Sequence, residues 1–77
     1  MSNVVLPELG EGITKATVAC WHIKEGERVD AQDDIVELVA DKAAFNVPAG
    51  NSGIVRRIMV KEGQDVKIGE TLAVIAP

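Results

Sequence analysis

The second half of this sequence repeats the first, and the repeat restricts the chain to folds with an internal twofold relation. Residues 23–29 (Ile-Lys-Glu-Gly-Glu-Arg-Val) recur 37 positions later as residues 60–66 (Val-Lys-Glu-Gly-Gln-Asp-Val). Upstream, Leu6-Pro7 recurs as Val47-Pro48 at an offset of 41. The two offsets, 37 and 41, predict four extra residues in the first half, in a loop at residues 10–17.

The local pattern predicts strands and no helix. β-Branched and apolar residues come in short runs bounded by Gly, Pro, Asp or Asn, which is typical of β-structure. The Lys-Glu-Gly segments predict turns in which Gly26 and Gly63 take a positive φ. The expected strands are residues 4–6, 17–23, 35–40, 44–47, 53–60 and 71–75, with short extended pieces near Val29 and Val66.

Two related sets of four strands predict a flattened sandwich of two sheets, because each half must cover the apolar face of the other. If each half is a compact unit, the residues joining them form a hairpin at one end, with the chain termini toward the other. The expected core residues are Val29, Ile35, Leu38, Ile54, Ile58, Val66, Leu72 and Val74.

Size and charge exclude several classes of function. A chain of 77 residues buries too little surface for an enclosed catalytic cleft. Eight Lys and Arg against 12 Asp and Glu give a net charge of −4, which argues against binding to nucleic-acid phosphates. We therefore expect no catalytic residues and no nucleic-acid partner.

The sequence also predicts no metal site. Cys20 and His22 are the only Cys and His, and the carboxylates are scattered along the chain. Cys20 is expected to be a packing residue. Trp21 and Ile23 share one face of a strand, so His22 points away from them toward the surface.

The joint between the two halves is Ala40-Asp41-Lys42-Ala43. Apolar strands flank it on both sides, so Asp41 and Lys42 are the only charges near the apex. Lys42 has no counterpart in the repeat, because the position 37 residues further on lies past the last residue. A charged pair is also the ordinary way to solvate a turn, and the joint alone does not separate that reading from a functional one.

The whole chain resembles the lipoyl domain of the acyltransferase component of 2-oxo acid dehydrogenase complexes. The resemblance implies an all-β fold, a flattened barrel of two four-stranded antiparallel sheets with internal twofold pseudo-symmetry. The matching segments are residues 6–13 (Leu-Pro-Glu-Leu-Gly-Glu-Gly-Ile), residues 21–26, Asp41-Lys42-Ala43, Val47-Pro48-Ala49, Gly53 and residues 60–63.

The resemblance implies that Lys42 carries lipoic acid, attached by a dedicated lipoate-attaching enzyme. The lipoyl group would be acylated by a thiamine-diphosphate 2-oxo acid decarboxylase and pass its acyl group to coenzyme A at an acyltransferase domain. Dihydrolipoamide dehydrogenase, a flavoprotein, would then reoxidise it. In this picture the domain is a non-catalytic, monomeric carrier.

The resemblance also suggests recognition residues. Asp41 and Ala43 would guide the modifying enzyme, since biotinyl domains of the same fold resemble Met-Lys-Met here. Glu8 and Glu11 lie in the loop that helps a decarboxylase identify its own domain. The chain departs from many relatives at residues 39–40, where Val-Ala replaces Glu-Thr.

Several alternatives remain at the level of sequence. The chain could be a biotinyl carrier or an unmodified adaptor of the same fold. The opening at residues 6–13 favours a pyruvate or a branched-chain complex over a 2-oxoglutarate complex.

We expect residues 1–77 to be one domain, an excised N-terminal part of a longer acyltransferase, without a membrane span or targeting segment. Its compartment would be the bacterial cytoplasm or the mitochondrial matrix.

Overall fold

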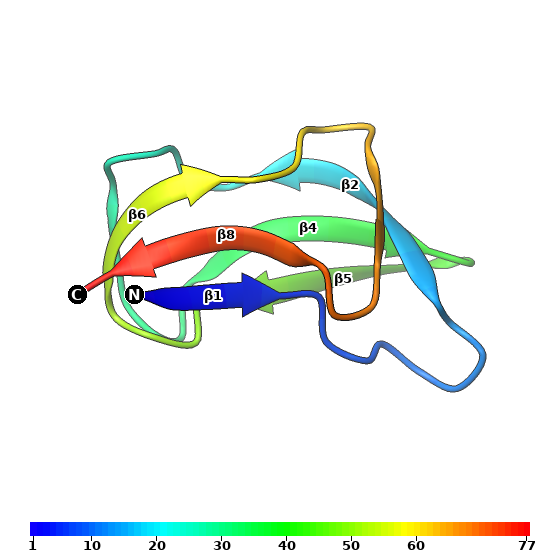
Figure 1. Ribbon diagram of the computed structural model, residues 1–77. Helices are drawn as coiled ribbons and strands as arrows, with labels where there is room; N and C mark the ends of the chain where they lie inside the picture. The colour runs from blue at the N-terminus through cyan, green and yellow to red at the C-terminus, as the bar shows by residue number, and fades with distance from the viewer.

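The computed structural model describes residues 1–77 as eight strands and no helix (Figure 1). Every expected strand is present, with ends that differ by at most two residues from those predicted. Without a helix, the chain has no helical segment that could cross a membrane. The strands are β1 (Ser2–Val5), β2 (Lys15–Trp21), β3 (Arg28–Val29), β4 (Asp34–Ala40), β5 (Ala43–Pro48), β6 (Gly53–Ile58), β7 (Asp65–Lys67) and β8 (Thr71–Ala76).

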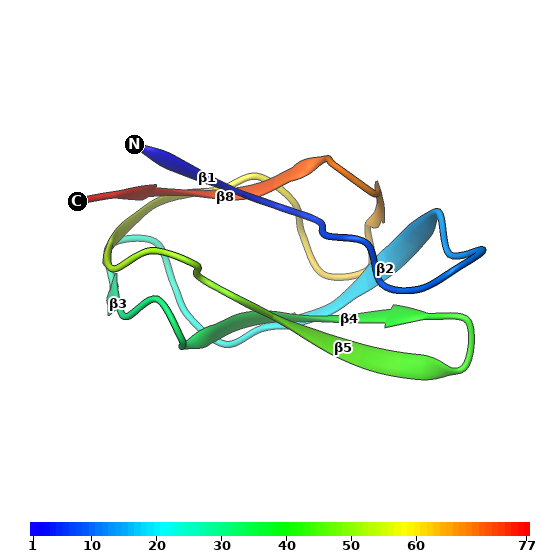
Figure 2. The same ribbon diagram turned by 90° about the horizontal axis from the view of Figure 1, so that it is seen from below.

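The strands form two four-stranded sheets that face each other, as predicted. The first sheet has the order β1-β8-β6-β3 and the second has the order β5-β4-β2-β7. All neighbouring strands are antiparallel. Figure 2 shows the two layers from the side, with β1 and β8 in one and β4, β5 and β2 in the other. The molecule measures 34 × 20 × 17 Å, so it is elongated along the strands.

The two halves of the repeat are not separate compact units, and that part of the prediction is wrong. Each sheet takes two strands from each half: β1 and β3 join β8 and β6, while β2 and β4 join β5 and β7. The physical reason is that the four strands of one half divide between both layers, so their edges are completed by strands of the other half. The hairpin at the joint nevertheless forms, at the end of the molecule opposite the termini (Figure 1).

Backbone hydrogen bonds repeat at the same offset of 37 as the sequence. The amide of His22 donates to the carbonyl of Ile35 at 2.9 Å, and the amide of Met59 donates to the carbonyl of Leu72 at 2.8 Å. Both Lys-Glu-Gly turns carry the predicted positive φ, 92° at Gly26 and 85° at Gly63. A β-bulge interrupts β2 between Val18 and Cys20 and β6 between Val55 and Arg57, again 37 residues apart. The sequence repeat is therefore a repeat of backbone geometry.

The four extra residues of the first half lie in the loop between β1 and β2, as predicted, although this loop starts and ends earlier than residues 10–17. It spans residues 6–14. Between Pro7 and Ala16 lie eight residues, whereas four lie between their counterparts Pro48 and Gly53. The offset of 37 extends back to Ala16 and Gly53, which are both buried. The insertion therefore precedes Ala16.

One apolar core of 17 buried residues lies between the sheets. Five of the eight predicted core residues are fully buried, namely Val29, Ile35, Leu38, Val66 and Leu72.

Ile54, Ile58 and Val74 are only half-buried. Ile58 still packs against the core, whereas the assignment of Ile54 and Val74 to the core is wrong. Val55 in β6, and Leu72, Ala73 and Ile75 in β8, are buried. Alternation along a strand therefore turns Ile54 and Val74 toward the outer face. The bulge after Val55 breaks this alternation before Ile58.

Trp21 links the two sheets by a side-chain hydrogen bond as well as by packing. Its indole Nε1 donates a hydrogen bond of 3.0 Å to the backbone carbonyl of Val60. Trp21 belongs to the second sheet and Val60 follows the β6 strand of the first. The repeat partner of Trp21 is Ile58, which has no side-chain donor, so this bond occurs only once.

Replacing Gly53 by alanine should destabilise the fold strongly. A Cβ at this position would collide with the backbone carbonyl of Ala76 in the neighbouring strand. Overpacking of this kind typically costs about 1–3 kcal/mol, and the backbone of β8 cannot move aside as a side chain could. We expect Gly53→Ala to lower the free energy of unfolding in urea by about 3 kcal/mol.

Asn51→Ala is the matched control, because Asn51 is exposed in the connection just before Gly53. It should change the stability by less than about 0.5 kcal/mol. Equal urea midpoints for Gly53→Ala and the unaltered chain would contradict the close approach of β6 and β8.

Candidate functional site

The hairpin of β4 and β5 forms one end of the molecule. Its pairing is continuous up to Ala40 opposite Ala43, so Asp41 and Lys42 alone make the turn. β4 is an inner strand of its sheet, and Leu38, Ala40 and Val47 are buried in the core. A two-residue turn on such anchored strands holds its apex in a fixed place.

Asp41 gives the turn its shape. It is the only non-glycine residue with a positive φ, at 56°, and Lys42 does not share this conformation. Positive φ at the first central residue is a feature of the primed turns that close two-residue hairpins, whose twist matches that of the flanking strands. Aspartate tolerates the left-handed region better than most residues other than glycine and asparagine.

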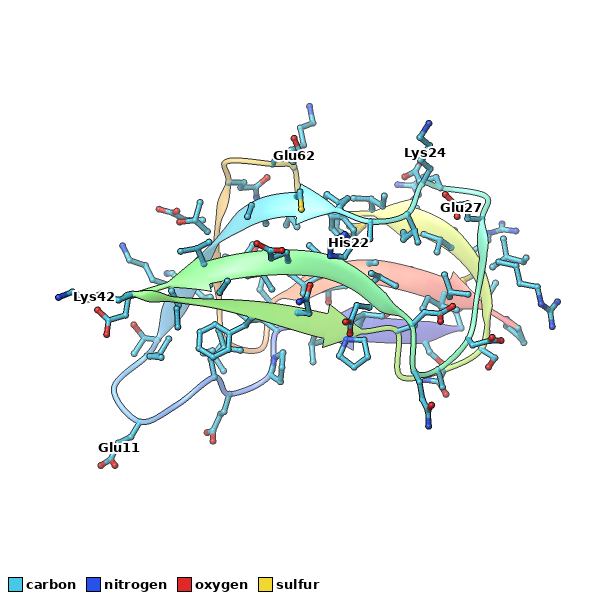
Figure 3. All side chains as sticks on the ribbon, turned by 180° about the vertical axis from the view of Figure 1, so that it is seen from behind. Glu11, His22, Lys24, Glu27, Lys42 and Glu62 are labelled. Atoms are coloured by element: carbon cyan, nitrogen blue, oxygen red, sulfur yellow. The ribbon has the colours of Figure 1, made fainter.

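Lys42 is fully accessible at the apex. The residue is exposed, and Figure 3 shows its side chain leaving the hairpin tip and pointing away from the body of the protein. The backbone beneath it is fixed by the turn, while the four-carbon stem remains free to rotate. An amine placed in this way can form an amide without disturbing any packed group.

The loop at residues 6–14 is held beside this hairpin by the turn between β7 and β8. The amide of Leu6 donates to the carbonyl of Glu70 at 2.9 Å, and the amide of Gly69 donates to the carbonyl of Leu6 at 2.8 Å. At the other end of the loop, the amide of Ile68 donates to the carbonyl of Thr14 at 3.1 Å. The longest connection of the chain is therefore fixed at both ends.

The structure brings Glu11 to the hairpin. Glu11, Lys15 and Asp41 line one shallow hollow. Glu11 and Lys42 also lie at the same end of the molecule in Figure 3. Glu8 does not line that hollow. It lines the adjoining one, of about 720 Å³, together with Glu11 and the apolar side chains of Leu9, Ile13 and Ile68.

The other predicted recognition residue, Ala43, is exposed at the first position of β5. Of Val39 and Ala40, only Val39 contributes to the surface: its side chain is 42% exposed, whereas Ala40 is 4% exposed and faces the core. An apolar side chain thus stands on the outside of the hairpin, close to its tip.

Sequence reasoning missed a second group of side chains. Cys20 Sγ, a ring nitrogen of His22 and a carboxylate oxygen of Glu37 all lie within 4.8 Å of one another. The carboxylates are scattered along the sequence, but the fold brings that of Glu37 beside Cys20 and His22. The missing information was strand register, because Glu37 becomes the neighbour of Cys20 only when β2 pairs with β4.

Comparisons with known proteins agree with this geometry. The family model described as "Biotin-requiring enzyme" matches residues 2–75. A succinyltransferase component of the 2-oxoglutarate dehydrogenase complex of Staphylococcus saprophyticus is 37% identical over 75 residues, which are 97% of this chain and 18% of that protein. The lipoamide acyltransferase component of the branched-chain complex of Bacillus subtilis is 31% identical, with 97% of this chain and 18% of that protein covered. The chain therefore spans less than a fifth of these relatives.

A solved structure is similar over the whole length. The solution structure of the lipoyl domain of the 2-oxoglutarate dehydrogenase complex of Azotobacter vinelandii superposes with a TM-score of 0.80 at 34% identity. The match covers 100% of this chain and 98% of that domain.

The strained conformation of Asp41 predicts a graded response to substitution. Asp41→Val places a β-branched residue in the left-handed region and should lower the free energy of unfolding by about 1–2 kcal/mol relative to Asp41→Gly. Urea unfolding measures both. Lys42→Gln, at the neighbouring position without positive φ, should stay within about 0.5 kcal/mol of the unaltered chain. Equal stability of the valine and glycine variants would contradict the turn described here.

Proposed function

This chain belongs to the biotin/lipoyl attachment family, and we propose that it is a lipoyl carrier domain in which Lys42 holds lipoic acid as an amide. The observation that carries the proposal is the position of Lys42: it is an exposed amine at the apex of an anchored two-residue turn. The domain itself is a carrier and catalyses no step.

Attachment changes the charge but not the fold. The Lys42 nitrogen forms an amide with the carboxyl group of lipoic acid, which removes one positive charge and takes the formal net charge from −4 to −5. When bound, lipoic acid supplies a dithiolane that can be reduced, can accept an acyl group and can be reoxidised. The part played by this chain is to hold the attachment point in place.

The placement of the termini supports a carrier role. Both termini lie at the end of the molecule opposite the hairpin (Figure 1). A polypeptide continuing from either terminus would leave the lysine end free to enter the active sites of partner enzymes. Tethering raises the effective concentration of the carried group at each of those sites without any new contact.

The partners we propose are a thiamine-diphosphate 2-oxo acid decarboxylase, an acyltransferase domain, dihydrolipoamide dehydrogenase and a lipoate-attaching enzyme. Two carboxylates, Glu11 and Asp41, face one cation, Lys15, around the hollow at the lysine end, and this acidic balance favours a basic surface on the enzymes that dock there. The opening at residues 6–13 favours a pyruvate or branched-chain complex, while relatives include a 2-oxoglutarate complex. We place the domain in a longer acyltransferase of the bacterial cytoplasm or mitochondrial matrix.

A biotinyl carrier is the second candidate, because the matched family also includes biotin-requiring enzymes. The residues flanking Lys42 favour lipoic acid. In the family resemblance, biotinyl domains have methionine on both sides of the lysine, where this chain has Asp41 and Ala43. Asp41 also takes the positive φ of the turn, so we propose a structural role for this residue besides its role in recognition.

Attachment of lipoic acid should depend on Lys42 alone. We expect incubation with lipoate ligase, ATP and lipoic acid to add one lipoyl group per chain, measured as intact mass. Lys42→Gln should add none, and incubation with biotin ligase, ATP and biotin should leave the mass unchanged.

Lys61→Gln is the matched control, because Lys61 is also exposed in a turn and should keep the adduct. A lipoyl adduct on Lys42→Gln would move the attachment site elsewhere. A biotin adduct on the unaltered chain would assign the domain to biotin-dependent enzymes, and a folded chain that takes neither group would be an unmodified adaptor.

Glu11 should affect docking of the decarboxylase without affecting attachment. The lipoylated chain is first assayed with pyruvate, 2-oxoglutarate and branched-chain decarboxylases, and the enzyme with the highest kcat/KM for reductive acylation is used. Glu11→Gln should lower that kcat/KM by about two- to fivefold, since an exposed charge pair contributes at most about 1 kcal/mol. The difference should shrink as salt is added.

Glu62→Gln removes the same charge from a distant turn (Figure 3) and should leave kcat/KM unchanged. An equal fall for both variants would mean that only net charge matters, and recognition at the hairpin end would be rejected.

A further inference from the structure

The outer face of the second sheet carries a compact group of polar side chains that the carrier function does not use. Cys20 and Glu37 are directly opposite each other on β2 and β4, and Asn46 of β5 is opposite Glu37 on its other side. His22 lies two residues after Cys20 on the same face. Four residues along the strand separate Glu37 from the Asp41 turn, about 14 Å at the usual rise per residue.

Three different donor types converge in this group. The Cys20 sulfur, a His22 ring nitrogen and a Glu37 carboxylate oxygen lie within 4.8 Å of one another. Donors around a tetrahedral zinc ion stand about 2.0–2.3 Å from the metal. Two ligands at that radius around a tetrahedral ion are about 3.3–3.8 Å apart, so each donor–donor separation has to close by at most about 1.5 Å.

His22 is already oriented by a further contact. Its Nε2 lies 2.9 Å from Oδ1 of Asn46. An amide oxygen only accepts hydrogen bonds, so Nε2 is the donor and the lone pair of the neutral ring is on Nδ1. Outer contacts of this kind fix the tautomer and ring orientation of histidines that bind metals.

We propose that Cys20, His22 and Glu37 form a binding site for a thiophilic divalent cation of the zinc type. A thiolate with an imidazole selects zinc and similar transition metals over magnesium or calcium, which take oxygen ligands. Binding forms a metal–sulfur bond and releases the thiol proton to solvent. Three protein ligands leave one coordination position open to water or to a group from a partner.

The distribution of residues supports a specific site. Cys20 and His22 are the only cysteine and histidine of the chain, and the fold places both on one face beside a carboxylate. Cys20 and Glu37 are half-buried while His22 is exposed, so a cation can enter from solvent. The bound ion would join β2 to β4, the strand that leads to Lys42, and would stabilise this pair against unfolding.

Titration with Co²⁺ tests the site, because cobalt replaces zinc and reports thiolate ligation by a sulfur-to-metal charge-transfer band. The unlipoylated Lys42→Gln chain is used as background, with a phosphine reductant, so that no other thiol competes. We expect a band that saturates at one Co²⁺ per chain and disappears when Zn²⁺ is added. Cys20→Ser should abolish the band.

Variants of His22, Glu37 and Asn46 distinguish a site with three ligands from metal binding by the Cys20 thiol alone. His22→Gln and Glu37→Gln should each weaken Co²⁺ binding by more than about 100-fold, and Asn46→Ala by about tenfold as an orienting contact. Glu62→Gln, a matched exposed carboxylate, should bind as the background does. Circular dichroism and the Tm of each apo variant establish that it is folded.

The proposal is overturned if the background chain shows no charge-transfer band, or if His22→Gln and Glu37→Gln, while folded, bind Co²⁺ as tightly as the background. Saturation at half an equivalent, with a dimer by light scattering, would also overturn it, because the ligands would then come from two chains.

Discussion

Every strand of this protein has a hydrogen-bonded neighbour from the other half of the repeat, and the rest of the structure depends on this pairing. β1 pairs with β8, β2 with β7, β3 with β6, and β4 with β5. Neither half could bury its apolar residues or complete its sheet edges alone, because its strands are divided between the two layers. One shared core of 17 residues follows, and folding of the halves must be cooperative.

The same pairing builds the functional end. The joint between the halves is a hairpin because β4 and β5 are neighbours in one sheet, and its tip is held by the strands beneath it. The inserted residues of the first half then occupy the space beside the tip and place Glu11 next to Asp41. The proposed attachment point and the proposed recognition residues therefore lie at one end, with Lys42 exposed and the carboxylates of Glu11 and Asp41 around one hollow. The termini lie at the other end and do not interfere (Figure 1).

Prediction failed for one local reason and one non-local reason. Locally, alternation from the buried Val55 turns Ile54 outward, and the bulge between Val55 and Arg57 then turns Ile58 back against the core, where it is half-buried. The group of Cys20, His22 and Glu37 was not foreseen because its members belong to different strands. Sequence spacing shows which residues share a strand face, but it does not say which strand lies alongside or in what register.

The sequence by itself determined the number of strands, the twofold relation, the turns at Gly26 and Gly63, and Lys42 as the lysine without a repeat partner. These features depend on local chemistry: apolar runs between turn residues and a repeat that can be read directly along the chain. Only the tertiary structure decided that the halves interleave, that Glu11 lies near the hairpin while Glu8 lies in the next hollow, and that the side chains of Cys20, His22 and Glu37 meet. Those features depend on which strand edges pair across the repeat, and edge pairing is settled by packing of the whole core rather than by any one segment.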